Sequence, residues 1–200
     1  MRIGIFGGTF DPVHFGHLVI AEQCREQARL DQVWFIPSAR PPHKPALTPF
    51  ERRSEMLQLA IAGNPAFRVE EIENERAGPS YTADTLAELH RRFPDAELHL
   101  ILGSDCLPDL PSWYEPARVV TQAKLVVVAR PGWPVWQAEQ LRSALRLPPD
   151  AALHEQIVPI PLIEIASRDL RRRVSEGRTI RYFVPNAVAA YIAEKKLYLA

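Results

Sequence analysis

The sequence predicts an α/β fold in which a mostly parallel sheet carries helices on both faces. Short apolar, β-prone segments alternate with helical patterns along nearly all of the 200 residues. Parallel neighbours need crossover connections, and the helical segments between the predicted strands supply them. The last two helical segments follow one another with no strand between them. We therefore expect a single domain over residues 1–200, with residues 167–200 as a candidate small helical subdomain.

The first predicted unit is a strand, a glycine turn and a helix. Residues 2–6 are apolar and β-prone, two glycines follow, and residues 15–29 show helical spacing of apolar side chains. Residues 33–36 predict a second buried strand that stops at a proline. A proline-rich loop then leads to a helix over residues 49–62, where proline is well tolerated at the first helical position.

The rest of the chain continues this alternation. Residues 67–69 indicate a weak strand, and a helix opens at Tyr81 or Thr82 and runs to residue 92. In open parallel sheets, ligands bind outside the carboxyl ends of the strands, so the loops that follow strands are where a site is expected. The remaining predicted elements are strands at 98–102, 124–129 and 157–160, and helices at 136–145, 167–176 and 185–195.

Composition and charge exclude several classes of protein. With 24 basic and 24 acidic residues the net charge is zero, so no overall field draws the chain to nucleic acid or to an anionic membrane. Cys24 and Cys106 stand far apart without CxxC spacing, which argues against a zinc site or a redox pair. The opening apolar run is too short for a signal peptide, and no apolar stretch approaches the roughly 20 residues that span a bilayer. We expect a cytoplasmic protein without nucleic-acid or membrane partners, and homo-oligomer formation stays open.

The segment GGTFDPVHFGH after the first strand holds the strongest chemical pattern. Gly7 and Gly8 let the backbone approach a ligand closely, and Thr9 adds a hydroxyl. His14 and His17 stand three residues apart, which places both imidazoles on one face of a helix start. Unpaired N–H groups and the helix dipole favour a phosphate there. Two glycines alone would indicate only a turn, but the joint pattern predicts a phosphate site.

This segment resembles the HxGH nucleotidyltransferase superfamily, in the form found in nicotinate-nucleotide adenylyltransferases. The resemblance continues in order and spacing through most of the chain, and it implies a Rossmann-like fold and a role in NAD biosynthesis. The other matching motifs are PPHK at 41–44, SYT at 80–82, LGSD at 102–105, SWYEP at 112–116 and RPG at 130–132.

The resemblance implies a reaction in which nicotinate mononucleotide attacks the α-phosphorus of ATP in line and pyrophosphate leaves, without a covalent enzyme intermediate. Such a reaction needs positioning and charge neutralisation more than a nucleophile. His14 and His17 are the implied catalytic residues, donating to the α-phosphate. Mg²⁺ would screen the β- and γ-phosphates, and no side chain is assigned as a metal ligand. The implied ATP-binding residues in the first two thirds of the chain are Gly7, Gly8, Thr9, Phe10, Lys44, Gly103 and Asp105.

Two of these residues keep an alternative interpretation. Lys44 lies in the proline-rich loop, where a solvated surface lysine is the alternative to a phosphate ligand. Asp105 follows a strong strand, where its carboxylate would accept from ribose hydroxyls or, alternatively, cap a helix.

The second phosphate motif departs from the family pattern. That pattern is close to I-S-S-T-x-L-R, whereas this chain has I-A-S-R-D-L-R at 165–171. Ser167 is expected to cap a helix that faces the phosphates, and Arg168 and Arg171 fall on one helix face by their spacing. Arginine in place of threonine removes a hydroxyl and adds a positive charge. We predict that these three residues bind ATP and that Arg172 and Arg173 lie on solvated surface.

The SYT and SWYEP motifs resemble the segments that recognise the pyridine ring. Trp113 offers a flat face for stacking, and the backbone N–H groups of Thr82 and Tyr114 are expected to receive the nicotinate carboxylate. A Trp-Tyr pair by itself is more often packing, so this assignment depends on the ordered set of motifs. The resemblance thus implies that Thr82, Trp113 and Tyr114 bind nicotinate mononucleotide.

Three other functions compete with this interpretation. Another nucleotidyltransferase of the superfamily, such as phosphopantetheine adenylyltransferase, has no use for SWYEP or SYT. A fragment of a class I aminoacyl-tRNA synthetase would need a Lys-Met-Ser-Lys-Ser-like setting and a basic patch, which the four lysines do not provide. A non-catalytic nucleotide-binding module would have no need of both His14 and His17.

Overall fold

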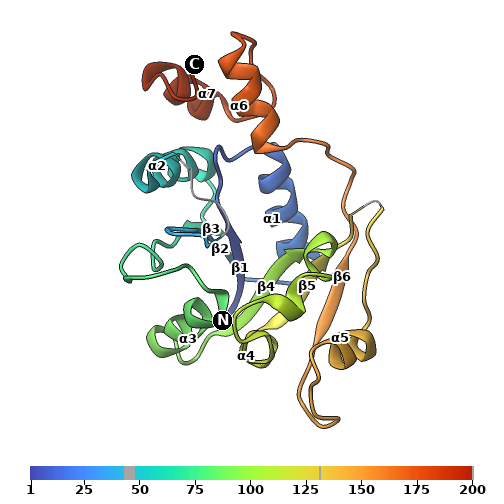
Figure 1. Cartoon of the computed structure of the whole chain (residues 1–200). Helices are drawn as coiled ribbons and strands as arrows, with labels where there is room; N and C mark the ends of the chain where they lie inside the picture. The colour runs from blue at the N-terminus through green and yellow to red at the C-terminus, as the bar shows by residue number, and fades with distance from the viewer. Residues whose placement is uncertain (43–47, 131, 200) are drawn as a thin grey trace.

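The structure, a computed structural model, describes residues 1–42, 48–130 and 132–199. Its centre is a six-stranded sheet of order β3-β2-β1-β4-β5-β6 (Figure 1). All five pairings between neighbouring strands are parallel, so the predicted α/β fold is confirmed. The strands are β1 (Arg2–Gly8), β2 (Gln32–Pro37), β3 (Phe67–Val69), β4 (Glu97–Gly103), β5 (Lys124–Val128) and β6 (Glu155–Val158).

Most of the predicted helices are present within two residues of their expected bounds. One helix, α4, was not predicted: it has seven residues and follows Glu115, whose φ of 48° is left-handed. The helices are α1 (Phe15–Gln27), α2 (Phe50–Ile61), α3 (Thr82–Arg92), α4 (Pro116–Gln122), α5 (Ala138–Ala144), α6 (Ser167–Ser175) and α7 (Asn186–Glu194), with short 3₁₀ helices η1 (Ser104–Cys106) and η2 (Leu110–Ser112).

Side chains of the sheet alternate between two apolar clusters, one on each face. The first cluster joins the strands to α3, α4 and α5, and the second joins them to α1, α2, α6 and α7. Burial on both faces explains why the strands are almost continuously apolar. Representative members are Ile5, Val127, Leu86, Val119 and Leu141 in the first cluster, and Phe35, Val126, Ala21, Met56, Leu170 and Val188 in the second.

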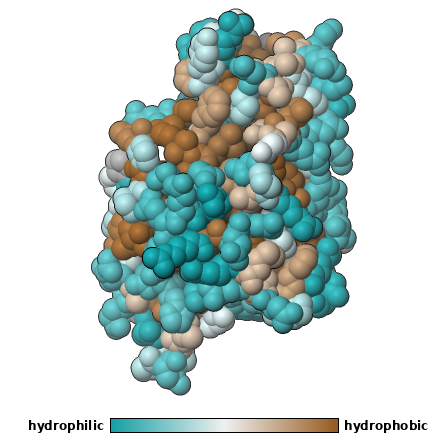
Figure 2. All heavy atoms as spheres, turned by 180° about the vertical axis from the view of Figure 1, so that it is seen from behind, coloured by the Kyte–Doolittle hydropathy of each residue, from teal (hydrophilic) through white to brown (hydrophobic). Residues whose placement is uncertain are grey.

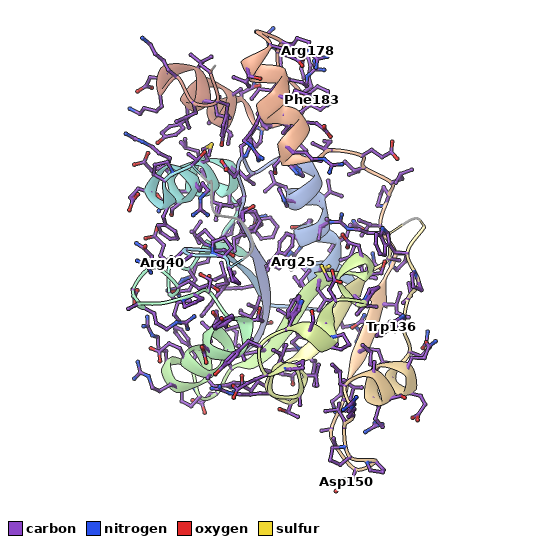
Figure 3. The ribbon with its side chains drawn as sticks, in the orientation of Figure 1. Arg25, Arg40, Trp136, Asp150, Arg178 and Phe183 are labelled. Carbon is purple, nitrogen blue, oxygen red and sulfur yellow. The ribbon has the colours of Figure 1, made fainter. Side chains whose placement is uncertain are left out.

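The C-terminal helices lie next to the beginning of the fold. Figure 1 shows α6 and α7 beyond one end of the sheet, close to α2 and to the start of α1. The backbone N–H of Phe15 donates to the carbonyl of Phe183 at 3.0 Å, and Phe183 is labelled in this part of the molecule in Figure 3. Seen from behind, apolar side chains gather toward this end, whereas the middle of the surface is mostly hydrophilic (Figure 2). The C-terminal part of the chain, from α6 onward, therefore packs on the turn that follows β1.

The strand order reverses direction between β1 and β4. The chain runs outward from β1 to β2 and β3, and then returns to place β4 on the other side of β1. At such a point the loops after the two central strands leave in opposite directions and open a crevice at the carboxyl edge of the sheet. The fold thus directs attention to the turn after β1 and to η1 after β4.

Candidate active site

The turn between β1 and α1, which we call the histidine turn (residues 9–17), is largely buried. Phe10 is 1% exposed and His14 is 5% exposed. Phe10 has a left-handed φ of 48°, an unfavourable conformation for a residue with a bulky side chain. Its ring packs edge-on against the His17 ring, with 5.0 Å between centroids. The Phe10 ring therefore packs inside the fold against His17, and its assignment to ATP stays a prediction.

The two histidines of the turn stack on each other. Their ring centroids are 3.7 Å apart, with an angle of 25° between the planes. The backbone N–H of His14 donates to Nδ1 of His17 at 3.2 Å. A neutral His17 therefore carries its proton on Nε2, where it is a hydrogen-bond donor. The sequence-based expectation that both imidazoles share one face of the helix start is confirmed.

The position of His14 keeps its ring uncharged. Burial, and after it the positive charge of Arg130, lower the pKa of His14 from 6.5 to about 4. The ring is neutral at pH 7 because this pKa lies well below neutrality. His14 thus offers a polar, uncharged ring beside His17.

Gly16 makes room for the stacked rings. A Cβ atom at this position would lie 3.0 Å from Nδ1 of His14 and 3.1 Å from Cε1. These distances are tighter than ordinary contacts, and the His14 ring is held by burial on its other sides. The ring of His14 therefore occupies the space that a side chain at position 16 would need.

Two predicted ATP ligands from α6 reach the histidine turn but bind its backbone. The Ser167 hydroxyl donates to the carbonyl of Pro12 at 2.9 Å, and Nη1 of Arg171 donates to the carbonyl of Asp11 at 2.6 Å. The prediction that Ser167 caps its helix is wrong. Ala166 is the N-cap residue, and Ser167 is the first residue of α6. The hydroxyl donates to a backbone carbonyl of the turn instead of accepting from an N–H at the helix end.

Two other predicted phosphate ligands have different outcomes. Arg168 is exposed at the start of α6, and its guanidinium charge is therefore accessible to a phosphate. Lys44 lies outside the residues that the structure describes. Both assignments stay predictions.

The edge after β4 combines a glycine, a carboxylate and an arginine. Nε of Arg130 lies 3.2 Å from Oδ1 of Asp105. A Cβ atom at Gly103 would lie 2.1 Å from that oxygen and 2.8 Å from Nε, so only glycine accommodates this ion pair. The backbone N–H of Arg130 donates to the buried Ser104 hydroxyl at 2.9 Å. Arg130, which follows β5, belongs to the RPG motif but was not among the predicted site residues.

The predicted pyridine-binding segments also meet in the structure. Tyr81, which precedes α3, stacks on Tyr114 with 4.4 Å between ring centroids. This contact brings Thr82, the first residue of α3, close to the segment after η2. Trp113 is half-buried and packs against the first apolar cluster, so its ring also supports the core. Tyr81 was overlooked as a site residue, although the SYT motif contains it.

Two hollows in the surface lie away from this site. One, of about 520 Å³, lies between α2 and β3, and the other, of about 830 Å³, lies between α6 and α7. Neither is lined by a residue assigned above. Over the described ranges, no three His, Cys, Asp or Glu side chains are grouped to hold a metal ion. Among the same residues, no helix has the length and apolarity needed to cross a membrane.

Comparison with known proteins places these features in a family. A family model described as cytidylyltransferase-like matches residues 5–173. A protein of Thermomicrobium roseum named probable nicotinate-nucleotide adenylyltransferase is 49% identical over 98% of this chain and 91% of its own length. A protein of Thermus thermophilus with the same name is 47% identical over 99% of this chain and its full length.

Solved structures show the same fold at lower sequence identity. Nicotinic acid mononucleotide adenylyltransferase of Plasmodium falciparum, solved in complex with NaAD, is 20% identical and superposes with a TM-score of 0.80 over 98% of this chain and 97% of its own. A putative nicotinate-nucleotide adenylyltransferase of Vibrio parahaemolyticus is 18% identical, with a TM-score of 0.68. At these identities the likeness supports the architecture alone.

Proposed function

The chain belongs to the cytidylyltransferase-like family and, within it, to the nicotinate-nucleotide adenylyltransferases, and we propose that it joins nicotinate mononucleotide to the AMP part of ATP. The products are nicotinate adenine dinucleotide and pyrophosphate. The observation that carries this proposal is the stacked His14–His17 pair at the carboxyl edge of β1, beside the reversal of strand order. This is where such a sheet binds nucleotides.

The chemical step is a displacement at phosphorus. A phosphate oxygen of nicotinate mononucleotide forms a bond to the α-phosphorus of ATP, and the bond from that phosphorus to the pyrophosphate oxygen breaks. Negative charge accumulates on the α-phosphate oxygens and on the leaving pyrophosphate. His17 donates from Nε2 to the α-phosphate, since its Nδ1 already accepts from the backbone of His14. A donor fixed before the reaction stabilises this charge with little reorganisation.

Positive charge comes from arginines around the turn. Arg130 lies close enough to His14 to lower its pKa, and its side chain is 47% exposed. It is therefore accessible to an anion as well as charged, and we assign it to the phosphate chain of ATP. Arg168 at the start of α6 is a second candidate for this role. Asp105 holds Arg130 in place and leaves part of its carboxylate for a ribose hydroxyl.

Magnesium is proposed to enter with ATP. Mg²⁺ keeps several waters and is often bound through substrate phosphates plus one or two carboxylates, so a dedicated protein cage is not required. Asp105, the carboxylate at the β4 edge, is already paired with Arg130, so the phosphates of ATP together with water would hold the ion. When bound, Mg²⁺ neutralises charge on the β- and γ-phosphates.

We propose that the part of the site that holds nicotinate mononucleotide recognises its carboxylate. α3 begins at Thr82 with its first N–H groups directed out of the helix, and no side chain of the described residues caps them. A carboxylate is an acceptor only, and it gains from the positive end of a helix. The pyridine ring of the substrate would lie against Tyr81, Tyr114 or Trp113. This arrangement favours nicotinate mononucleotide as the substrate.

The proposed activity is tested by supplying ATP and Mg²⁺ with one acceptor at a time. We expect pyrophosphate and nicotinate adenine dinucleotide with nicotinate mononucleotide, and no pyrophosphate above background with 4′-phosphopantetheine. Pyrophosphate with the second acceptor alone would contradict the proposal in favour of another adenylyltransferase. Nucleotide binding without pyrophosphate from either acceptor would indicate a non-catalytic module.

A further inference from the structure

The histidine turn contains a buried carboxylate, Asp11, whose two oxygens accept hydrogen bonds from two distant parts of the chain. Asp11 is 2% exposed. Its Oδ1 accepts from the Tyr198 hydroxyl at 2.6 Å, and its Oδ2 accepts from the backbone N–H of Thr48 at 3.2 Å. A carboxylate without water is tolerated only when its oxygens are hydrogen-bonded. The two partners therefore stabilise Asp11 inside the fold and fix its position.

A buried arginine holds the same turn from a second side. Arg53 is 1% exposed. Its Nη1 donates to the carbonyl of Thr9 at 2.9 Å, and its Nε donates to the carbonyl of Thr48 at 2.8 Å. The negative charge of Asp11 partly offsets the burial that lowers the pKa of Arg53. Asp11 and Arg53 each connect the histidine turn to Thr48.

The last residues of the chain are held in an unusual backbone conformation to make this contact. Lys196 and Tyr198 have left-handed φ values of 52° and 63°. Such conformations persist in residues other than glycine when the surroundings over-determine them. Burial and the hydrogen bond to Asp11 raise the pKa of the Tyr198 phenol. It therefore stays protonated, and donates, over the whole physiological pH range.

We propose that Tyr198 is a positioning residue for AMP transfer: its hydroxyl fixes Asp11, and Asp11 fixes the backbone of the turn that carries His14 and His17. The inference rests on the proposed function, because it assigns a role in that reaction. Asp11 and Phe10 are adjacent, and Phe10 supports the His17 ring from its left-handed conformation. Displacement of catalytic groups by about 1 Å lowers rates by about 10²-fold, so a loosened Asp11 affects the chemical step.

A second tyrosine provides a matched control. Tyr191 on α7 donates its hydroxyl to the carboxylate of Glu55 on α2. Both tyrosines lie in the C-terminal part and both bind a carboxylate. Glu55 is on the surface side of α2 and has no contact with the histidine turn among the described hydrogen bonds. A purely structural role for Tyr198 would lower the Tm of a Tyr198→Phe variant but leave the kcat of the folded enzyme unchanged, as is expected for Tyr191→Phe.

The experiment compares Tyr198→Phe with Tyr191→Phe in the full chain. Both variants keep the ring, and the Tm of each shows how far it is destabilised. We expect Tyr198→Phe to lower kcat about tenfold while the KM for each substrate stays within about twofold, and Tyr191→Phe to leave kcat within about twofold. An unchanged kcat in Tyr198→Phe, or an equal fall in both variants, would overturn the proposal.

A double-mutant cycle tests whether the hydroxyl acts through Asp11. Asp11→Asn is made in the wild-type chain and in Tyr198→Phe. We expect the second substitution to lower kcat much less in Tyr198→Phe than in the wild type, because the two residues act as one unit. If the two substitutions lower kcat by independent factors, so that Asp11→Asn has the same effect in both backgrounds, Tyr198 does not act through Asp11. The proposed function is tested independently of this role, because it fails if the wild type does not use nicotinate mononucleotide. In that case the kcat of each variant is compared with that of the wild type on the acceptor that the wild type does use.

Discussion

In the histidine turn Asp11 is 2% exposed and Arg53, which binds the turn, is 1% exposed, whereas Tyr114 beside α3 is 47% exposed. Hydrogen bonds from α2, α6 and the chain end converge on residues 9–12. The segment around Tyr114 is held by the stack on Tyr81 and by surface pairs such as Arg118 with Asp84 at 3.3 Å. Pairs of this exposed kind contribute about 0–1 kcal/mol.

This difference corresponds to two requirements of the proposed reaction. Charge that develops on phosphorus is best stabilised by groups that are already in place, and the histidine turn has them fixed by buried contacts. Recognition of a planar ring needs surfaces that open and close around it, and the tyrosine pair is exposed enough to do so. We infer that the histidine turn is preorganised and that the pyridine-binding side, around Tyr81 and Tyr114, adapts to the substrate.

The largest expected effect comes from removing the side chain of His17, the proposed hydrogen-bond donor in the histidine turn. We predict that His17→Ala lowers kcat by about 10²–10³-fold, because loss of one fixed donor to developing charge costs about 2.7–4 kcal/mol. Steady-state kinetics with ATP and nicotinate mononucleotide measure this. His154→Ala, an exposed position before β6, serves as the control and should leave kcat unchanged. A folded His17→Ala variant with more than about half of the wild-type kcat would remove His17 from the mechanism.

The pyridine-binding side is expected to determine which mononucleotide the enzyme prefers. We predict a preference for nicotinate over nicotinamide mononucleotide of at least about 10²-fold in kcat/KM, since an amide leaves one buried N–H unpaired at about 1–3 kcal/mol and loses charge-assisted bonds. Trp113→Ala should lower kcat/KM for both, because stacking does not distinguish acid from amide. Its Tm must be measured in parallel, as Trp113 also packs against the first cluster. Equal values for the two mononucleotides would contradict acid recognition while leaving the transferase assignment intact.

The burial of His14 predicts how the free energy of unfolding depends on pH. Its folded pKa of about 4 lies below the unfolded value of 6.5, so its neutral state stabilises the fold above pH 6.5. This contribution is lost as the pH falls from 6.5 toward 4. Between pH 6.5 and 4.5 the wild type should lose about 2 kcal/mol more unfolding free energy than His14→Asn. Denaturant unfolding at the two pH values measures the difference, and parallel losses in both proteins would show that the His14 ring is not held neutral.

The smallest expected effect concerns Arg168, the residue that departs from the family pattern. An exposed cation at the start of α6 is expected to raise ATP affinity modestly, so Arg168→Ala should raise the KM for ATP about threefold, with the KM for the mononucleotide unchanged. Arg172→Ala is the matched control, because Arg172 is exposed on the same helix and pairs with Asp169. If both variants keep wild-type ATP kinetics, Arg168 is solvated surface.

Local patterns in the sequence predicted most of the fold and the centre of the site. Apolar runs such as residues 124–129 identify buried strands, because a strand covered on both faces has almost no polar positions. Helix α4 was missed because its short sequence contains Val119, Val120 and Thr121, β-branched residues that favour strands. Strand β6 was displaced because its first half, Glu155 and Gln156, is polar. The histidines were identified because their spacing in a glycine turn is itself informative.

The contacts that fix the turn could not be predicted in the same way. Arg53 and Tyr198 lie 44 and 187 residues from their partners in the turn, and no local pattern distinguishes them from surface residues. Asp11 was visible within the motif, but its burial depends on the packing of the C-terminal helices. Ser167 and Arg171 were predicted to bind ATP, and their hydrogen bonds to backbone carbonyls of the turn depend on a geometry that spacing does not specify.

Amide hydrogen exchange tests the contrast between the two sides most directly. In the free protein, we expect the amides of residues 9–17 to exchange at least about tenfold more slowly than those of residues 80–84 and 112–116. Addition of nicotinate mononucleotide with a non-hydrolysable ATP analogue should then slow the second group strongly and the first group little. Equal exchange of the two groups in the free protein, with a similar slowing on substrate binding, would contradict a preorganised histidine turn.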